Sequence, residues 1–254
     1  ELVDAIRRET GNPRIHVELA DLALMAEVDA LAHRLREKGR PVDVLINNAG
    51  ALFNPRQVTP EGLEKSFALL LLSPFRLTLG LHPLLAEAGR ARVVNVVSGG
   101  MYTQPLEVDR LQAPETDYSG SVAYARCKRA LMVLTEQWAR AFADQGIVVN
   151  AMHPGWADTP GIRNALPGFH RLTRRILRSP EEGADTMVWL AMATEAGKVS
   201  GALFLDREPR TTHLRSATRE SPQAREKLRA YLAPFAPAAA TEAPPAAGAD
   251  GTAA

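Results

Sequence analysis

The stretch Val42-Asp-Val-Leu-Ile-Asn-Asn-Ala-Gly50 decides the fold, because a short apolar run is followed at once by polar and small residues. Such a run is typical of a strand buried in a parallel sheet. Two further stretches repeat the pattern, Val93-Val-Asn-Val-Val-Ser98 and Ile147-Val-Val-Asn-Ala-Met-His-Pro-Gly155. Because the carboxyl ends of parallel strands lie at one edge of a sheet, we expect Asn48, Ser98 and the Pro-Gly break to gather there.

Helical patterns alternate with these strands along the chain. Helices are predicted over residues 1–10, 22–38, 61–87, 122–142, 180–196 and 222–232, and a further strand over 202–206. This alternation is typical of a doubly wound α/β fold with a parallel sheet. Residues 99–123 contain several Pro and Gly and are predicted to form an irregular excursion that shapes a substrate pocket. The apolar stripe Leu131, Leu134, Trp138 and Phe142 is interpreted as core or as a subunit contact.

Tyr124 and Lys128 lie four residues apart in Val122-Ala-Tyr-Ala-Arg-Cys-Lys-Arg129, so they share one face of a helix. A tyrosine titrates at about 10, and it exchanges protons near neutrality only where a positive charge stabilises its phenolate. Lys128 is placed to lower that pKa. The same spacing also occurs on ordinary amphipathic helices, so the assignment depends on the strand ends around it.

These elements, in this order, resemble the short-chain dehydrogenase/reductase family from residue 1 to about residue 206. Within the family, residues 98–112, 128–138 and 153–160 are similar to one subgroup. The resemblance implies a Rossmann-like sheet, NAD or NADP as the cofactor, and an oxidoreductase that interconverts a carbonyl and an alcohol on a small-molecule substrate. It also implies a homo-oligomer.

The resemblance gives each site residue a role. Tyr124 is implied as the general acid in carbonyl reduction and the base in the reverse direction, Lys128 as the holder of the nicotinamide ribose, and Ser98 as the hydrogen-bond partner of the substrate oxygen. The implied cofactor-binding residues are Asp21, Leu22, Asn47, Asn48, Ala49, Gly50, Tyr124, Lys128, Pro154, Gly155, Trp156 and Thr159. Asp21 has a second interpretation as a cap of the next helix, and Asn-Gly turns are common.

The sequence departs from the family at its amino terminus. The family begins with a strand, a glycine-rich phosphate loop, a helix and a second strand, whereas Glu1-Leu-Val-Asp-Ala-Ile-Arg-Arg-Glu-Thr-Gly11 reads as a helix that ends at a glycine. By the resemblance, we therefore expect the first β-α-β unit to be missing from this stretch of sequence, and with it the residue that selects NAD or NADP. We expect a truncated or wrongly started chain, because a sheet without its centre exposes a large apolar surface; a natural short form is the alternative.

A second departure is Leu70, which occupies the position of the asparagine that supports a proton relay in the family. A leucine side chain neither donates nor accepts a hydrogen bond, so the resupply of the proton to Tyr124 is in question. The alternative is that the relay runs through the backbone carbonyl of residue 70, since main-chain oxygens often hold water.

Composition narrows the functional class. The net charge of +1 predicts no nucleic-acid partner, and the single cysteine, Cys127, excludes an internal disulfide. The six histidines show no paired ligand spacing, so no metal is expected. The longest apolar run, residues 67–72, is too short to span a bilayer, and we expect a cytoplasmic protein.

The chain is predicted to form one amino-terminally incomplete domain over residues 1–234, followed by a disordered Ala/Pro-rich tail over 235–254. Residues 155–179 match the substrate lid of the family. Their basic, amphipathic character indicates a solvated helix first and an acidic substrate or a membrane surface second. The leading hypothesis is an NAD(P)-dependent oxidoreductase. The alternatives are a catalytically silent binding or regulatory module and a fragment without function of its own.

Overall fold

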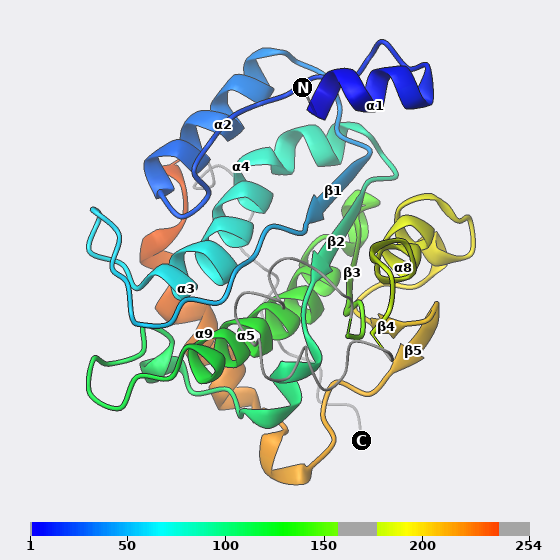
Figure 1. Ribbon diagram of the computed structural model, residues 1–254. Coiled ribbons are helices and arrows are strands. Elements are labelled where there is room, and N and C mark those ends of the chain that lie inside the picture. The colour runs from blue at the N-terminus through cyan, green and yellow to red at the C-terminus, as the bar shows by residue number, and fades with distance from the viewer. Residues whose placement is uncertain (1, 157–176, 239–254) are drawn as a thin grey trace.

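The computed structural model describes residues 2–156 and 177–238, and a five-stranded sheet with the order β1-β2-β3-β4-β5 forms its centre (Figure 1). The first four strands are parallel, and the last is antiparallel to its neighbour. The strands are β1 (Val44–Asn47), β2 (Arg92–Val96), β3 (Val148–Met152), β4 (Leu203–Leu205) and β5 (Glu208–Arg210). The predicted α/β class with a doubly wound, mainly parallel sheet is confirmed.

Helices connect the strands as the sequence pattern indicates. They are α1 (Leu2–Thr10), α2 (Met25–Glu37), α3 (Lys65–Phe67), a π-helical turn (Ala68–Leu72), α4 (Ser73–Glu87), α5 (Gly120–Ala141), α8 (Pro180–Met192) and α9 (Pro222–Leu232). Short 3-10 turns cover Gly99–Thr103, Val108–Arg110, Ala143–Gln145, Ala196–Lys198, Ser216–Thr218 and Ala233–Phe235. Helix α9 has the predicted bounds, because Ser221 caps it by accepting from the Ala224 amide at 3.1 Å and Pro222 occupies its first turn.

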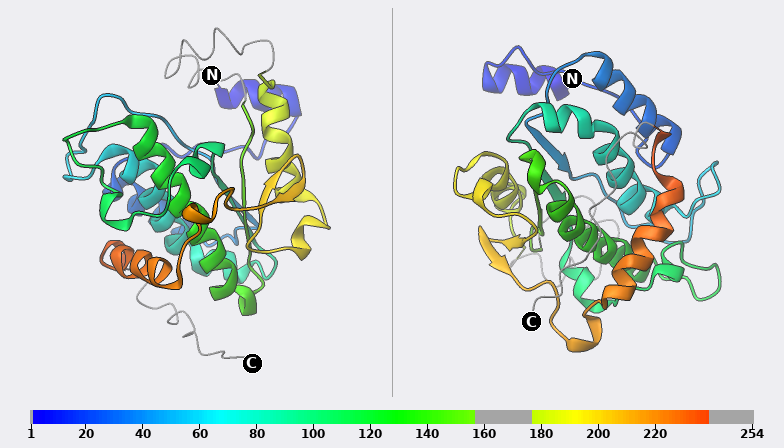
Figure 2. Two further views of the ribbon diagram at one scale, coloured as in Figure 1. Left: turned by 90° about the horizontal axis from the view of Figure 1, so that it is seen from below. Right: turned by 180° about the vertical axis from the view of Figure 1, so that it is seen from behind.

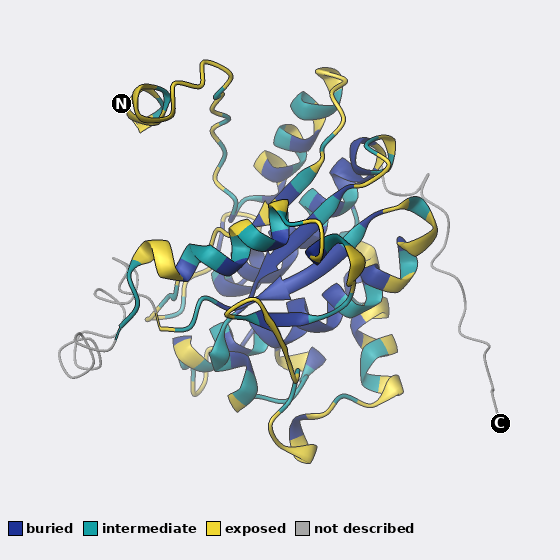
Figure 3. Cartoon of the chain, turned by 90° about the vertical axis from the view of Figure 1, so that its right-hand side faces the viewer, coloured by how far each residue is buried: buried dark blue, intermediate teal, exposed yellow. Residues whose placement is uncertain are grey.

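The two faces of the sheet are covered by different helices. In β2, Val93 faces the larger core, which contains side chains of α2, α4 and α5, whereas Val94 and Val96 face a smaller cluster that includes Leu190 of α8. This alternation follows from the two-residue repeat of a strand. Figure 3 shows the sheet as a buried layer between helices.

Helix α5 crosses the larger core beside α9 (Figure 2). The stripe Leu131, Leu134, Trp138 and Phe142 is buried within the chain, at most 7% exposed. Its interpretation as core is therefore confirmed, and a second subunit is not needed to cover it.

The helical stretch Lys65–Glu87 is long and apolar enough to cross a membrane by length and composition. Within the domain, 72% of its most apolar window is buried. That burial is the pattern of a core helix, and the stretch packs against α2 and the sheet (Figure 1).

The edge of the sheet at β1 is partly exposed. In the described residues β1 pairs with β2 on one side, and Ile46 is 37% exposed. Helix α1 has no buried residue and projects from the body of the domain (Figure 3). The segment between α1 and α2 also exposes Val17 and Leu19.

Candidate active site

The carboxyl edge of β2 and the first turns of α5 bring Ser98 and Tyr124 together. Ser98 lies two residues beyond β2, where its side-chain oxygen accepts a hydrogen bond from the Gly100 amide at 3.2 Å. Its hydroxyl also lies close enough to the phenol of Tyr124 to lower the pKa of that phenol. The two hydroxyls that the sequence places on separate elements thus form one pair, as a site for a single substrate oxygen requires.

Lys128 lies one helical turn beyond Tyr124 and is 3% exposed. Its Nζ donates to the carbonyl oxygen of Val96 at 2.6 Å and lies 5.8 Å from the centre of the Tyr124 ring. Burial lowers the pKa of Lys128 to about 8, because the charged form loses its hydration.

Burial raises the pKa of Tyr124, and the hydrogen bond from Ser98 offsets part of that rise. The sequence predicts the opposite direction through the Lys128 charge. The difference arises because the phenol is buried, and burial disfavours its charged form. The neutral phenol is therefore the stable form of Tyr124 at neutral pH. It carries a proton to donate, and its raised pKa makes it a weaker acid than a phenol with a pKa near neutrality.

The buried lysine predicts a pH dependence of stability. An exposed lysine has a pKa of 10.5, so between about 8 and 10.5 the unfolded chain binds more protons than the folded one, and stability rises with pH across that window. We expect the free energy of unfolding of the wild type, minus that of Lys128→Met, to rise by about 3 kcal/mol over this range. Urea unfolding at several pH values measures this difference. A difference that does not change with pH would show that the pKa of Lys128 is not lowered in the folded protein.

The residues of the Asn-Asn-Ala-Gly turn divide into two groups. Asn48, Ala49 and Gly50 are exposed at the carboxyl end of β1 and remain candidates for the cofactor cleft. Asn47 has a different position, because its side chain points into the core and donates to Thr78 Oγ1 at 3.1 Å and Asn95 Oδ1 at 2.8 Å. Asn47 therefore joins β1 to β2 and α4 rather than facing a ligand.

Leu70 lies in the π-helical turn and is fully buried. A Cβ atom added to Gly50 would lie 3.2 Å from Leu70 Cδ2 and 3.7 Å from Lys128 Nζ, so the leucine and the ammonium border the same small space. In this turn the Ser73 amide donates to the Ala68 carbonyl, five residues back. Such a turn inserts one residue into the ladder and leaves a backbone carbonyl for another donor, such as water.

The turn after β3 presents Pro154, Gly155 and Trp156, with Trp156 53% exposed. Gly155 has φ +71, a left-handed conformation that favours glycine, and a Cβ atom there would also lie 2.9 Å from Nε of the Arg178 side chain. Arg178 pairs with both carboxylate oxygens of Asp206. Thr159 and most of the predicted lid lie outside the described residues.

Asp21 and Leu22 precede α2. The Asp21 carboxylate accepts from the Ala23 amide at 2.9 Å, which is a local turn before the helix. The interpretation of Asp21 as the cap of α2 is therefore wrong, because the N-cap position is Leu24. Leu22 is partly buried against the larger core.

Two features of the site were not predicted from the sequence. Arg178 and Asp206 support the Gly155 turn from segments that lie 28 residues apart. His153 is buried beneath the same turn, forms an edge contact with the Tyr102 ring at 6.3 Å, and has its pKa lowered mainly by burial. The sequence shows His153 directly before Pro154-Gly155, but nothing in the local pattern indicates that its ring contacts Tyr102.

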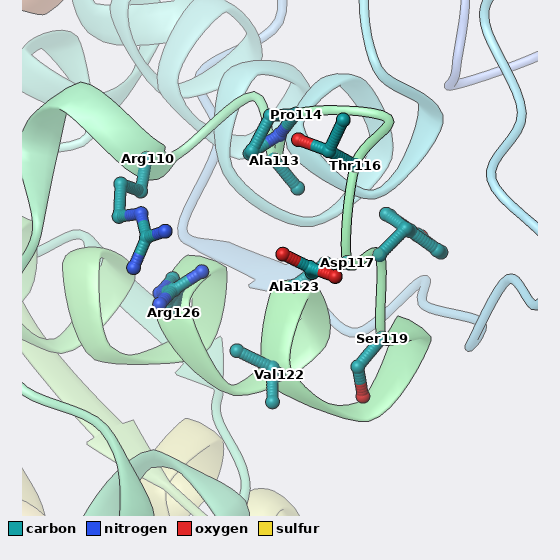
Figure 4. A pocket seen from close by; sticks show the side chains of 10 residues that line it. Arg110, Ala113, Pro114, Thr116, Asp117, Ser119, Val122, Ala123 and Arg126 are labelled. Carbon is teal, nitrogen blue, oxygen red and sulfur yellow. The ribbon is translucent and has the colours of Figure 1, made fainter.

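A pocket of about 180 Å³ lies on the outer side of the first turns of α5. Figure 4 shows Arg110, Asp117, Ser119 and Arg126 around it. Its lining does not include Ser98, Tyr124 or Lys128, so this part of the irregular excursion borders a separate surface. Within residues 2–156 and 177–238, no group of three His, Cys, Asp or Glu side chains is arranged to hold a metal.

Comparisons with known proteins agree with this geometry. The family model for short chain dehydrogenase matches residues 1–167. The human dehydrogenase/reductase SDR family member 12, which represents the subgroup that the sequence resembles, is 44% identical over 87% of this chain and 69% of its own length. Human polyprenol dehydrogenase is 33% identical over 84% of this chain and 68% of its own length.

A solved structure of a protein from Beutenbergia cavernae has a similar fold. That protein is described as an NAD(P)-dependent gluconate 5-dehydrogenase and contains bound NADP; it is 25% identical to this chain, with a TM-score of 0.62 over 80% of this chain and 78% of its own. The chain therefore belongs to the short-chain dehydrogenase/reductase family.

Proposed function

We propose that this family member is an NAD(P)-dependent oxidoreductase that interconverts a carbonyl and an alcohol, with Tyr124 as the acid and base. The observation that carries the proposal is the position of the Tyr124 phenol, whose pKa the Ser98 hydroxyl lowers, on the same helix as the buried Lys128, whose Nζ lies 5.8 Å from the centre of the Tyr124 ring. Two hydroxyls at one point are suited to bind a carbonyl oxygen and to transfer a proton to it.

The residues present fit a nicotinamide cofactor. An ammonium has three N–H donors, and Lys128 uses one of them for Val96 in the described structure, so donors remain for ribose hydroxyls. Gly50 keeps the space beside Lys128 open, because a side chain there would crowd Leu70. Residues 48–50, 154–156, Tyr124 and Lys128 would hold the cofactor, which supplies the hydride when bound.

The chain's own groups then perform the proton chemistry. The Ser98 hydroxyl orients the substrate oxygen and donates to it as negative charge develops. The Tyr124 hydroxyl gives its proton to the same oxygen, and its raised pKa keeps that proton in place at neutral pH. In alcohol oxidation the roles reverse, and Tyr124 must first lose its proton.

The experiment measures NADH and NADPH oxidation by the full-length protein with farnesal and with benzaldehyde. Farnesal is chosen because one relative is named a polyprenol dehydrogenase. We expect turnover of at least one aldehyde that is abolished by heat denaturation and scales with protein concentration. Cofactor binding without turnover of either aldehyde would favour the silent binding module.

The silent module is the second candidate, and Leu70 is the observation that favours it. If the proton relay is broken at this position, Leu70→Asn should raise kcat by about tenfold or more, because proton transfer typically contributes about 10²- to 10⁴-fold. Leu70→Met is the control, since it keeps the volume without adding a hydrogen-bonding group. Healthy wild-type activity that Leu70→Asn leaves unchanged would show that the backbone of the π-helical turn suffices.

The substrate class, the location and the oligomeric state are proposals as well. We propose a small-molecule substrate, a cytoplasmic location and a homo-oligomer, as the family resemblance implies. Size-exclusion chromatography with light scattering tests the last of these.

A further inference from the structure

Tyr118 lies two residues before α5, and its hydroxyl meets two other segments of the chain. It lies 3.0 Å from the carbonyl oxygen of Phe53, 3.1 Å from Glu64 Oε1 and 3.3 Å from Ser66 Oγ. Phe53 belongs to the loop that follows the Asn-Asn-Ala-Gly turn, and Glu64 and Ser66 begin the helix that carries Leu70. One phenol thus connects three segments that border the candidate site.

The contact between Tyr118 and Glu64 matters because Glu64 is a buried acidic residue. Its side chain is completely buried and caps α3, accepting from the Ser66 amide at 3.0 Å and the Phe67 amide at 2.8 Å. A buried carboxylate must be satisfied by donors, because an unmet hydrogen bond costs more than a typical bond contributes. The Tyr118 hydroxyl supplies a further donor from another part of the chain, and its single proton is shared between Glu64 Oε1 and the Phe53 carbonyl oxygen.

The loop and the start of α5 also touch directly. Gly120 is the first residue of α5, and a Cβ atom there would lie 2.2 Å from the Phe53 carbonyl oxygen. Only glycine permits this approach. The Phe53 carbonyl is therefore fixed between Gly120 and the Tyr118 hydroxyl, four to six residues before Tyr124.

We infer that Tyr118 is a positioning residue of the active site. It holds the loop after Gly50 and the start of the Leu70 helix against the first turn of α5, and so sets the space between Gly50, Lys128 and Tyr124. The inference rests on the proposed function, because the site it positions is the oxidoreductase site. Tyr118 touches neither Ser98 nor Tyr124 in the described structure and acts through the loop and the helix.

The variant Tyr118→Phe keeps the ring and removes only the hydroxyl. Tyr231→Phe is the matched control: the Tyr231 hydroxyl accepts a hydrogen bond from Gln112 Nε2 at 3.1 Å, and its ring contacts Phe67 of the same helix start from another side. Loss of one hydrogen bond to a buried charged group corresponds to about a tenfold change in an equilibrium constant.

Three measurements on the full-length protein test the inference. Without cofactor, hydrogen exchange of a peptide covering residues 64–69 should be about tenfold faster in Tyr118→Phe than in the wild type. The dissociation constants of NADH and NADPH, from nicotinamide fluorescence, should rise by a similar factor, and kcat should fall. Tyr231→Phe should change none of the three.

The outcomes separate this inference from the proposed function. Faster exchange with unchanged cofactor affinity and kcat would make Tyr118 a purely structural residue and overturn the inference. Unchanged exchange would overturn it as well. A wild type that binds cofactor but reduces no aldehyde would refute the proposed function, while the change in cofactor affinity would still decide whether Tyr118 positions the cleft.

Discussion

Replacement of Tyr124 by phenylalanine is expected to lower kcat for aldehyde reduction by about 10²- to 10⁴-fold, the usual contribution of general acid catalysis. The ring stays in place, so the packing of α5 and the affinity for the cofactor should change little. The Ser98 hydroxyl loses its partner but remains able to bind the substrate oxygen. Steady-state kinetics with farnesal and a direct titration of the cofactor measure the two effects separately.

The control for this variant is Tyr231→Phe, which removes a phenol hydroxyl that hydrogen-bonds Gln112 rather than a residue of the candidate site. It should retain the wild-type kcat. If Tyr124→Phe keeps kcat within about threefold of the wild type, proton transfer through Tyr124 contributes under 1 kcal/mol and the assigned role is wrong.

Arg129→Ala is expected to destabilise the fold by about 3–5 kcal/mol, the usual cost of breaking a buried ion pair. The Arg129 side chain is 0% exposed and its Nε lies 2.9 Å from Glu220 Oε1, whose side chain is 3% exposed. Its guanidinium also donates to the carbonyl oxygens of Thr212 and Thr218. Arg129 thereby fastens the segment before α9 to the helix that carries Tyr124 and Lys128, and its loss leaves the Glu220 charge buried without this partner.

The control for Arg129 is the exposed pair of Arg229 and Glu226 on α9, with exposed fractions of 60% and 59%. Because exposed ion pairs contribute at most about 1 kcal/mol, Arg229→Ala should leave stability within that range. Urea unfolding of both variants provides the comparison. Equal effects would mean that the Arg129 pair contributes no more than a surface pair.

The strands and helices that position the site were predictable because their signals are local. Ser221 and Pro222 mark the start of α9, and the apolar runs before Asn47 and Ser98 mark strands. Strand β5 was missed because its three residues are all exposed and carry no apolar alternation. It forms through a tight turn in which Asp206 and Arg207 both have positive φ, of 56° and 59°.

The candidate site was predictable where the periodicity of a helix or a strand determines the direction of a side chain. The four-residue spacing placed Tyr124 and Lys128 on one helical face, and the end of β2 placed Ser98 beside them. The direction of Asn47 follows from the two-residue repeat, which buries it with Leu45 on the core side of β1.

Contacts between distant segments were beyond sequence reasoning. Glu64 and Tyr118 are 54 residues apart, and no local pattern shows that a phenol meets a buried carboxylate there. The direction of the Tyr124 pKa has the same origin, since it depends on the burial of the phenol by segments that are distant in sequence.

The central claim is that Ser98, Tyr124 and Lys128 form a site for hydride transfer to a carbonyl. The most direct measurement is mass spectrometry of the alcohol formed from farnesal by the full-length protein, with NADPH and with NADH deuterated at the transferring carbon. The account predicts a product one mass unit heavier than that from unlabelled cofactor, and almost none from Tyr124→Phe. Unlabelled alcohol, or equal labelled product from Tyr124→Phe, would contradict it.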